Sequence, residues 1–165
     1  MVALLLLMIL GTLLNGNFLS FTNLTNIVSR SSFIGLIAIG ATFVITSGGL
    51  DLSVGSMAAF TSGMMIIIIN SLVPSLGAGW WSVGFGILAG LAIGSVGGAI
   101  NGVLVTVGRI EPFIVTLGTL GIFRALITFL ANGGTLNLNG DASDTYSPLY
   151  SGPNRAASRY PMRRH

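Results

Sequence analysis

Residues 33–73, FIGLIAIGATFVITSGGLDLSVGSMAAFTSGMMIIIINSLV, contain two apolar segments separated by a short polar one. The segments 33–46 and 54–73 carry no charge, and SGGLDLS lies between them at 47–53. A helix of about 20 apolar residues is long enough to cross a bilayer. The stretch therefore predicts two membrane-spanning helices with a polar break between them.

Further apolar segments on both sides of this stretch predict an all-α protein, a polytopic transmembrane helical bundle of about five spans. Two of them, Trp81–Val107 and Phe113–Ala131, are long enough to cross a bilayer. The run Met1–Leu14 is short for a span, which favours the remainder of a longer first span over a cleaved signal peptide, since no positive n-region precedes it. Residues 15–32 mix Asn, Ser and Thr with apolar side chains and predict a turn and a short amphipathic helix at the membrane surface.

The composition excludes most catalytic classes. Only 7% of the residues are charged, against roughly 25% in soluble domains. Cysteine is absent, the only histidine is His165, and all seven basic residues are arginines. Because thiolates, a central imidazole and the lysine of a phosphate-binding loop are missing, we expect no catalytic residue, no metal and no cofactor bound by this chain. The sequence also contains no nucleic-acid-binding motif, so no nucleic acid is expected as a partner.

Glycine recurs at every fourth position of the segment 81–107. Such small-xxx-small rows allow another helix backbone to approach closely, which favours helix packing in a bilayer. We expect the row to pack inside one subunit or, alternatively, to form a seam between subunits, with Gly55, Ala59 and Gly63 as a shorter partner row. The helix-packing row consists of Gly86, Gly90, Gly94, Gly98 and Gly102.

Asp51 is the only charge between Arg30 and Arg109, and it lies where the glycines of SGGLDLS interrupt the helical pattern. A carboxylate is costly in lipid and tends to mark a pathway or a partner there. Three roles fit these residues. Asp51 or Ser53 caps the helix that begins at Val54, Asp51 contacts a transported solute, or Asp51 has a role in gating or in pairing with another helix.

Three further charges lie in or between the later segments. Arg124 is an intramembrane charge in the segment 113–131, roughly 10 Å from the nearer end at 1.5 Å per residue. It either snorkels to the headgroups or faces inward to a carboxylate or carbonyl. Arg109 and Glu111 lie in a tight connection before Pro112, where we expect solvated charges, with docking of a cytoplasmic partner as the alternative.

The segment SGGLDLSVGS at 47–56 resembles the signature of sugar-type ABC importer permeases, the ribose, xylose and arabinose transporter subunits. The resemblance extends to INGVLVTVGRIEPFIVTLGTLGIFRAL at 100–126, in the same order and spacing, and covers residues 17–152. It implies that residues 1–152 are the N-terminal half of a permease domain, truncated relative to the family. The polar, Arg-rich tail 153–165 resembles nothing in the family and is interpreted as disordered or out of frame. The candidates for the central break or pathway are Gly48, Gly49, Asp51, Ser53 and Gly55.

The same resemblance implies a multi-pass protein of the cytoplasmic (inner) membrane, embedded in the lipid bilayer, with Arg109 and Glu111 in a cytoplasmic loop. The resemblance further implies that the protein moves a monosaccharide-like solute together with a second permease subunit and a periplasmic solute-binding protein, while separate ATP-binding subunits bind ATP. Since family members are about twice as long, we expect this chain to be inactive alone. The competing hypothesis is a non-transporting membrane scaffold or assembly subunit packed through the glycine row. An enzyme is not expected, because Asp51, Glu111 and Arg124 are scattered in the sequence.

Overall fold

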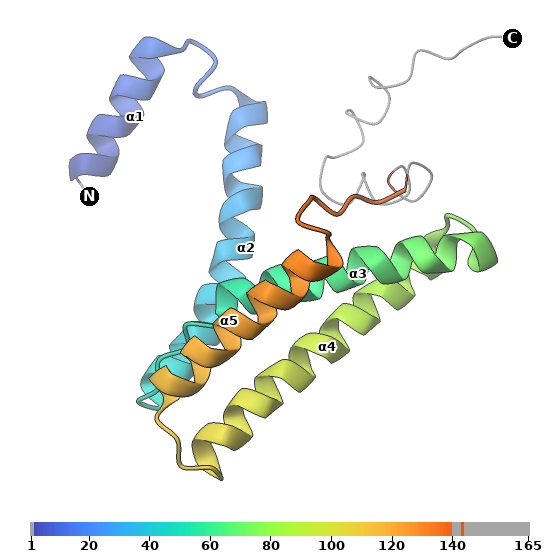
Figure 1. Cartoon of the computed structure of the whole chain (residues 1–165). Coiled ribbons are helices and arrows are strands. Elements are labelled where there is room, and N and C mark those ends of the chain that lie inside the picture. The colour runs from blue at the N-terminus through green and yellow to red at the C-terminus, as the bar shows by residue number, and fades with distance from the viewer. Residues whose placement is uncertain (1, 140–142, 144–165) are drawn as a thin grey trace, which may run out of the picture. The chain divides into compact units, whose positions relative to one another are not determined.

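The computed structural model describes residues 2–139 and 143, and within them every regular element is an α-helix (Figure 1). This confirms the all-α class. Four of the helices are long and apolar enough to cross a membrane, while α1 has only 13 residues. The tail 153–165 lies outside the described residues. The helices are α1 (Val2–Leu14), α2 (Phe21–Thr46), α3 (Val54–Leu76), α4 (Trp80–Thr106) and α5 (Pro112–Leu130).

The chain divides into two compact units, residues 1–43 and the residues from Val44 onward, which are described separately. In the first unit a turn joins α1 to α2. The ring of Phe18 in this turn lies over Gly11, so closely that a Cβ atom at Gly11 would be 2.7 Å from Cε2 of the ring. Asn23 Nδ2 donates to the carbonyl oxygen of Phe18 at 2.6 Å. A close ring contact and a side-chain hydrogen bond therefore fix the turn.

The helix α2 is continuous, whereas the sequence predicted a short interfacial helix before a separate span. Residues 21–33 contain neither glycine nor proline, so no residue in this polar stretch breaks the helix. Its hydroxyls bond back to the helix: Thr25 Oγ1 donates to Phe21 O and Ser32 Oγ donates to Val28 O, both at 2.9 Å. Because these hydroxyls are satisfied locally, the polar stretch continues into the apolar one, and the predicted boundary near residue 33 is wrong.

In the second unit α3 packs against both α4 and α5 (Figure 1). Phe60 of α3 stacks on Phe123 of α5 with ring centroids 5.5 Å apart. Ile69 of α3 and Val83 of α4 are almost completely buried. The core of this unit therefore lies between α3 and its two neighbours, and it fixes where the ends of the three helices meet the break that follows α2.

Asn70 ties the segment after α5 to α3. Its Nδ2 donates to Asn137 O at 2.9 Å, and its Oδ1 accepts the backbone N–H of Asn139 at 2.8 Å. Asn70→Ala removes both hydrogen bonds, each worth about 0.5–1.5 kcal/mol, so amide hydrogen exchange at Asn139 should speed up by roughly two- to tenfold. Mass spectrometry on the protein in nanodiscs measures this rate. Asn70→Asp is the control because it keeps the oxygen that Asn139 uses, and unchanged exchange in the alanine variant would contradict the tie.

Candidate functional site: a polar junction at a helix break

Two glycines build the break between α2 and α3. Gly48 has φ +83°, a backbone conformation that strongly favours glycine. The N–H of Gly48 donates to Ile45 O and the N–H of Gly49 donates to Val44 O, both at 3.0 Å. This pair of hydrogen bonds is the Schellman ending of a helix. The chain therefore leaves α2 at these glycines and turns into the segment that carries Asp51.

Asp51 folds back onto Ser53 and does not reach the first turn of α3. Its Oδ1 accepts the backbone N–H of Ser53 at 2.8 Å and the Ser53 hydroxyl at 2.7 Å. Ser53 directly precedes α3, and its side chain makes no capping hydrogen bond to that helix. The predicted cap by Asp51 or Ser53 on the first turn of α3 is therefore wrong. The carboxylate instead orders the short turn in which it lies, as aspartates often do two residues before the amide they accept.

Two further helices reach the break with buried polar side chains. Asn101 of α4 is 6% exposed, and its Nδ2 donates to Ser53 Oγ at 2.9 Å. Thr116 of α5 is 3% exposed, and its hydroxyl lies 2.8 Å from Pro112 O of its own helix and 3.2 Å from Leu50 O of the break, so its single proton has an acceptor on either side. We call Asp51, Ser53, Asn101 and Thr116 the polar junction. It connects the break to both α4 and α5.

One buried atom of the polar junction has no hydrogen-bond partner among the described residues. This atom is Oδ1 of Asn101, and it is buried. An unpaired buried oxygen costs about 1–3 kcal/mol. The Ser53 hydroxyl accepts from Asn101 and donates to Asp51, so the hydrogen bonds run in one direction, from α4 to the carboxylate. The packing of α4 therefore holds a buried amide in an arrangement that is one hydrogen bond short.

Sequence reasoning identified Asp51 and Ser53 but missed Asn101 and Thr116. Asn101 is the only amide or charged side chain in α4, and strongly polar residues inside a membrane span are functional candidates. Thr116 carries no comparable signal, because helix threonines usually bond only within their own helix. At Gly55, also a predicted site residue, no described residue of another helix lies within 4 Å of the Cβ position.

The glycine row of α4 divides into a packed half and an open half. A Cβ atom at any of the first three positions would lie within 4 Å of α3, whereas no described residue lies within 4 Å of a Cβ atom at the last two. Gly63, which was predicted to face this row, lies against Ile127 of α5 instead. The packed positions are Gly86, Gly90 and Gly94, the open ones are Gly98 and Gly102, and the facing residues of α3 are Thr61, Met65 and Ile69.

Arg109 and Glu111 lie in the connection between α4 and α5, and both are exposed. Arg109 has φ +52°, and Glu111 directly precedes α5, whose first residue is Pro112. Proline suits this first position because its missing N–H has no partner in a helix. Exposure at a tight connection fits solvated charges, and their position on the cytoplasmic side stays a prediction.

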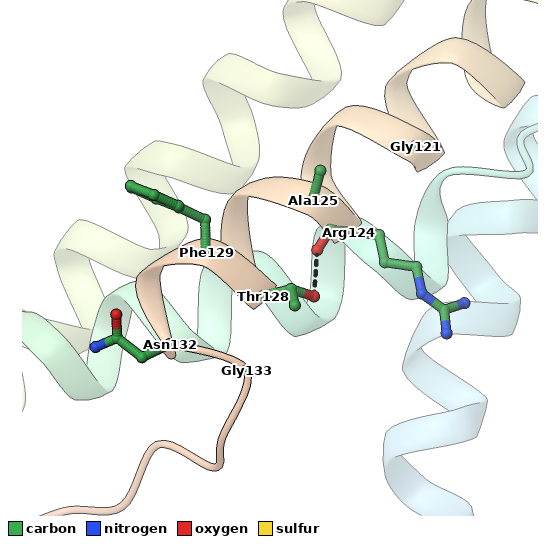
Figure 2. A pocket seen from close by; sticks show the side chains of 7 residues that line it. All are labelled: Gly121, Arg124, Ala125, Thr128, Phe129, Asn132 and Gly133. Carbon is green, nitrogen blue, oxygen red and sulfur yellow. Dashed lines mark hydrogen bonds between the residues drawn. The ribbon is translucent and has the colours of Figure 1, made fainter.

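Arg124 lies on the exposed face of α5. It lines a shallow groove of about 660 Å³ along that face, shown in Figure 2. Within the part of the chain that the structure describes, no carboxylate pairs with it, so neither predicted role is settled by a contact. We call this feature the α5 groove; its lining residues are Gly121, Arg124, Ala125, Thr128, Phe129, Asn132 and Gly133.

Ser53→Ala is expected to loosen the polar junction. The change removes the acceptor for Asn101 Nδ2 and a donor to Asp51, so Nδ2 joins Oδ1 in having no hydrogen-bond partner. We expect the free energy of unfolding to fall by about 2 kcal/mol, measured by denaturant titration in bicelles. Ser62→Ala is the control, since the exposed Ser62 hydroxyl donates only within its own helix. If Ser53→Ala and Ser62→Ala lowered the free energy of unfolding equally, the polar junction would contribute nothing to stability.

The chemistry available at the polar junction is hydrogen bonding around one carboxylate. Among residues 2–139 and 143, no group of three or more His, Cys, Asp or Glu side chains could hold a metal ion. The polar junction can fix the ends of three helices relative to one another, and it can hold a carboxylate at a break between membrane-length helices. Both properties suit a membrane protein whose helices rearrange.

The chain is similar to known membrane transport proteins over most of its length. Residues 23–158 match a family described as "Branched-chain amino acid transport system / permease component". The ribose import permease of Escherichia coli strain K12 is 36% identical over 137 residues, which cover 83% of this chain and 40% of that protein. The ribose import permease of Bacillus subtilis strain 168 is 38% identical over 132 residues, covering 79% and 38%. The autoinducer 2 import system permease of Yersinia pseudotuberculosis strain YPIII is 36% identical over 137 residues, covering 81% and 36%.

These similarities include the polar junction and the α5 groove, because both lie within residues 23–158. The chain spans about 40% of the length of the curated relatives it matches. No solved structure gave a significant match. The family match therefore covers the whole described part of the second unit and nearly all of α2.

Proposed function

Because this chain belongs to the family of permease components of branched-chain amino acid transport systems, we propose that it forms part of the membrane pathway of an importer for a monosaccharide-like solute. The observation that carries the proposal is the match over residues 23–158, which contains the polar junction. The ribose import permeases of two distantly related bacteria are 36% and 38% identical to this chain, and they support a sugar-like solute.

Two expectations from the sequence are confirmed by these findings. The resemblance of SGGLDLSVGS to importer permeases is confirmed by the family match and the permease relatives. With four helices long and apolar enough to cross a bilayer, the chain is a multi-pass protein of the inner membrane. The relatives are transport permeases, which fits the expectation that this chain is not an enzyme.

The partners belong to the proposal. Since the relatives are components of import systems, this chain acts with ATP-binding subunits, a periplasmic solute-binding protein and a second permease subunit. ATP is bound and hydrolysed on the ATP-binding subunits. Binding of ATP and of the loaded solute-binding protein shifts the helices between outward-facing and inward-facing arrangements, as any ligand does that prefers one of two states.

The polar junction supports a moving permease in one specific way. One hydrogen bond, from Asn101 to Ser53, attaches α4 to the break, and the Thr116 hydroxyl of α5 has Leu50 O of the break as an alternative acceptor to Pro112 O of its own helix. Such bonds exchange for others at small net cost, about 0.5–1.5 kcal/mol each. The break between α2 and α3 is therefore a suitable place for helices to change their relative positions during transport.

A chimera tests the proposal. Residues 23–158 replace the matching segment of the Escherichia coli ribose import permease in a strain without its own copy, and the host supplies the partner subunits. We expect uptake of labelled ribose above the empty-vector level, and loss of that uptake when the host ATP-binding subunit carries an inactive ATP site. A chimera that reaches the membrane in normal amounts but accumulates no ribose would contradict a ribose-type pathway.

The 165 residues expressed by themselves are proposed to be inactive. They span about 40% of the length of the permeases they resemble, and those permeases work with partner subunits. We therefore expect no ribose uptake from the chain alone in the same strain. Uptake at the level of the chimera would show that these residues suffice.

A further inference from the structure

The helix α5 has two different faces. Its inner face packs on α3 and α4, with Phe123 against Phe60 and Gly97, and with Ile127 against Gly63. Its outer face carries the α5 groove, in which Arg124 is exposed. An arginine within a membrane span normally faces protein or water and pairs with a carboxylate or carbonyl. The outer face of α5 therefore requires a partner that the described residues do not supply.

The depth and direction of Arg124 argue against a simple reach to the headgroups. It lies six residues before Leu130 and twelve after Pro112, about 9 Å and about 18 Å along the helix axis. Side chains in a helix lean toward its N-terminus. Figure 2 shows Arg124 extending away from Asn132, which lies at the C-terminal end of the groove. The guanidinium is thus directed away from the nearer end of the helix.

The floor of the α5 groove is made of small residues. No described residue lies within 4 Å of a Cβ atom at Gly121, and Ala125 follows one turn later. The Thr128 hydroxyl donates to Arg124 O at 2.8 Å, so it is already satisfied (Figure 2). Small residues let another helix approach closely in a bilayer. The groove therefore offers a close-packing floor beside a cation that no described carboxylate pairs with.

We propose that the α5 groove is a docking surface for a membrane-spanning helix that carries a carboxylate at the depth of Arg124. A guanidinium binds a carboxylate through two parallel hydrogen bonds, which fixes both partners in depth and rotation. The apolar floor accepts the backbone of the incoming helix, and Arg124 selects helices that carry an acid. This inference concerns assembly and stands whether or not the chain transports a sugar.

The described carboxylates of this chain do not fill the role. Asp51 accepts two hydrogen bonds from Ser53 and is part of the polar junction. Glu111 lies thirteen residues before Arg124 at the start of the same helix, which places it about 20 Å away along the axis. No described carboxylate is therefore placed to pair with Arg124, so the proposed carboxylate lies on another helix, and charge complementarity decides which helices qualify.

Two synthetic peptides test the proposal. Each is a membrane-spanning Leu/Ala helix with a single cysteine, and the two differ only in a central Glu or Gln. Since the protein has no cysteine of its own, Ala125→Cys introduces a unique thiol in the groove. We expect the Glu peptide to form disulfides with this thiol about tenfold faster than the Gln peptide in phosphatidylcholine vesicles. Arg124→Gln should abolish the preference, and Ile122→Cys, outside the groove, is the control position.

The outcomes of this experiment distinguish a docked helix from other possible occupants of the α5 groove. Equal rates for the Glu and Gln peptides on the chain with Arg124 intact would overturn the proposal, and this comparison needs no change at Arg124. If phosphatidylglycerol in the vesicles suppresses the Glu preference, a lipid phosphate occupies the groove and the proposal fails. If the Glu peptide reacts faster only with the double variant Asp141→Asn/Asp144→Asn, the chain's own carboxylates occupy the α5 groove in the unchanged protein. The proposal then also fails. None of these results depends on ribose uptake by the chimera.

Discussion

Gly86→Leu is expected to separate α3 from α4 and to lower the free energy of unfolding by about 3 kcal/mol. At this position a Cβ atom alone would lie 2.8 Å from Cδ1 of Ile69 and 3.4 Å from Met65 O. Ile69 is completely buried and cannot move aside without disturbing the core. A leucine adds three more carbon atoms in the same place, so the two helices must shift apart.

The same substitution at Gly98 is the matched control, because it lies in the same row of α4. No described residue lies within 4 Å of a Cβ atom there, and replacing a helix glycine removes about 1 kcal/mol of unfavourable propensity. We therefore expect Gly98→Leu to be neutral or slightly stabilising in the same denaturant titration in bicelles. Similar losses at both positions would mean that the whole row packs against a neighbour, as the sequence alone predicted.

The membrane-spanning helices of the second unit could be predicted from the sequence for two reasons. The thickness of the bilayer sets the length of a spanning helix, and glycine or proline marks where several of these helices begin or end. The predicted segments 54–73, 81–107 and 113–131 correspond to α3, α4 and α5 within a few residues. Gly77 ends α3 with a positive φ, and Pro112 begins α5. Glycine and proline act on the backbone locally, so their effect is visible without knowledge of the tertiary structure.

The partners of the break could not be predicted in the same way. Asp51 and the two glycines before it act within seven residues of sequence, and that local pattern was enough to identify the break. Asn101 reaches Ser53 across 48 residues, and this contact depends on how α4 is rotated about its own axis. Because α4 is apolar on all sides, its sequence favours no face and leaves that rotation to packing against α3. Gly86 and its neighbours set the rotation only once they lie against Met65 and Ile69.

Asn101→Asp is expected to destabilise the protein by about 3 kcal/mol or more, as strongly as any single change at the polar junction. The substitution removes the Nδ2 donor to Ser53 and places a buried carboxylate close to the half-buried Asp51. The Ser53 hydroxyl has one proton and donates to Asp51, so it cannot satisfy both acids at once. Neither electrostatic repulsion nor desolvation of the new carboxylate is offset by a cation, since no described residue forms an ion pair there.

Asn101→Leu separates this effect from the loss of the amide itself. Leucine has the same branching as asparagine, although it is larger, and it removes the Nδ2 donor together with the unpaired Oδ1. Removing a buried polar atom without a partner also removes the free-energy cost of burying it. We therefore expect the free energy of unfolding of Asn101→Leu to stay within about 1 kcal/mol of the unchanged protein. Denaturant titration of both variants in bicelles, with membrane insertion verified first, gives the two values. If the leucine variant loses as much stability as the aspartate variant, the hydrogen bond from Asn101 to Ser53 matters more than the charge, and the unpaired oxygen has a partner in the folded protein.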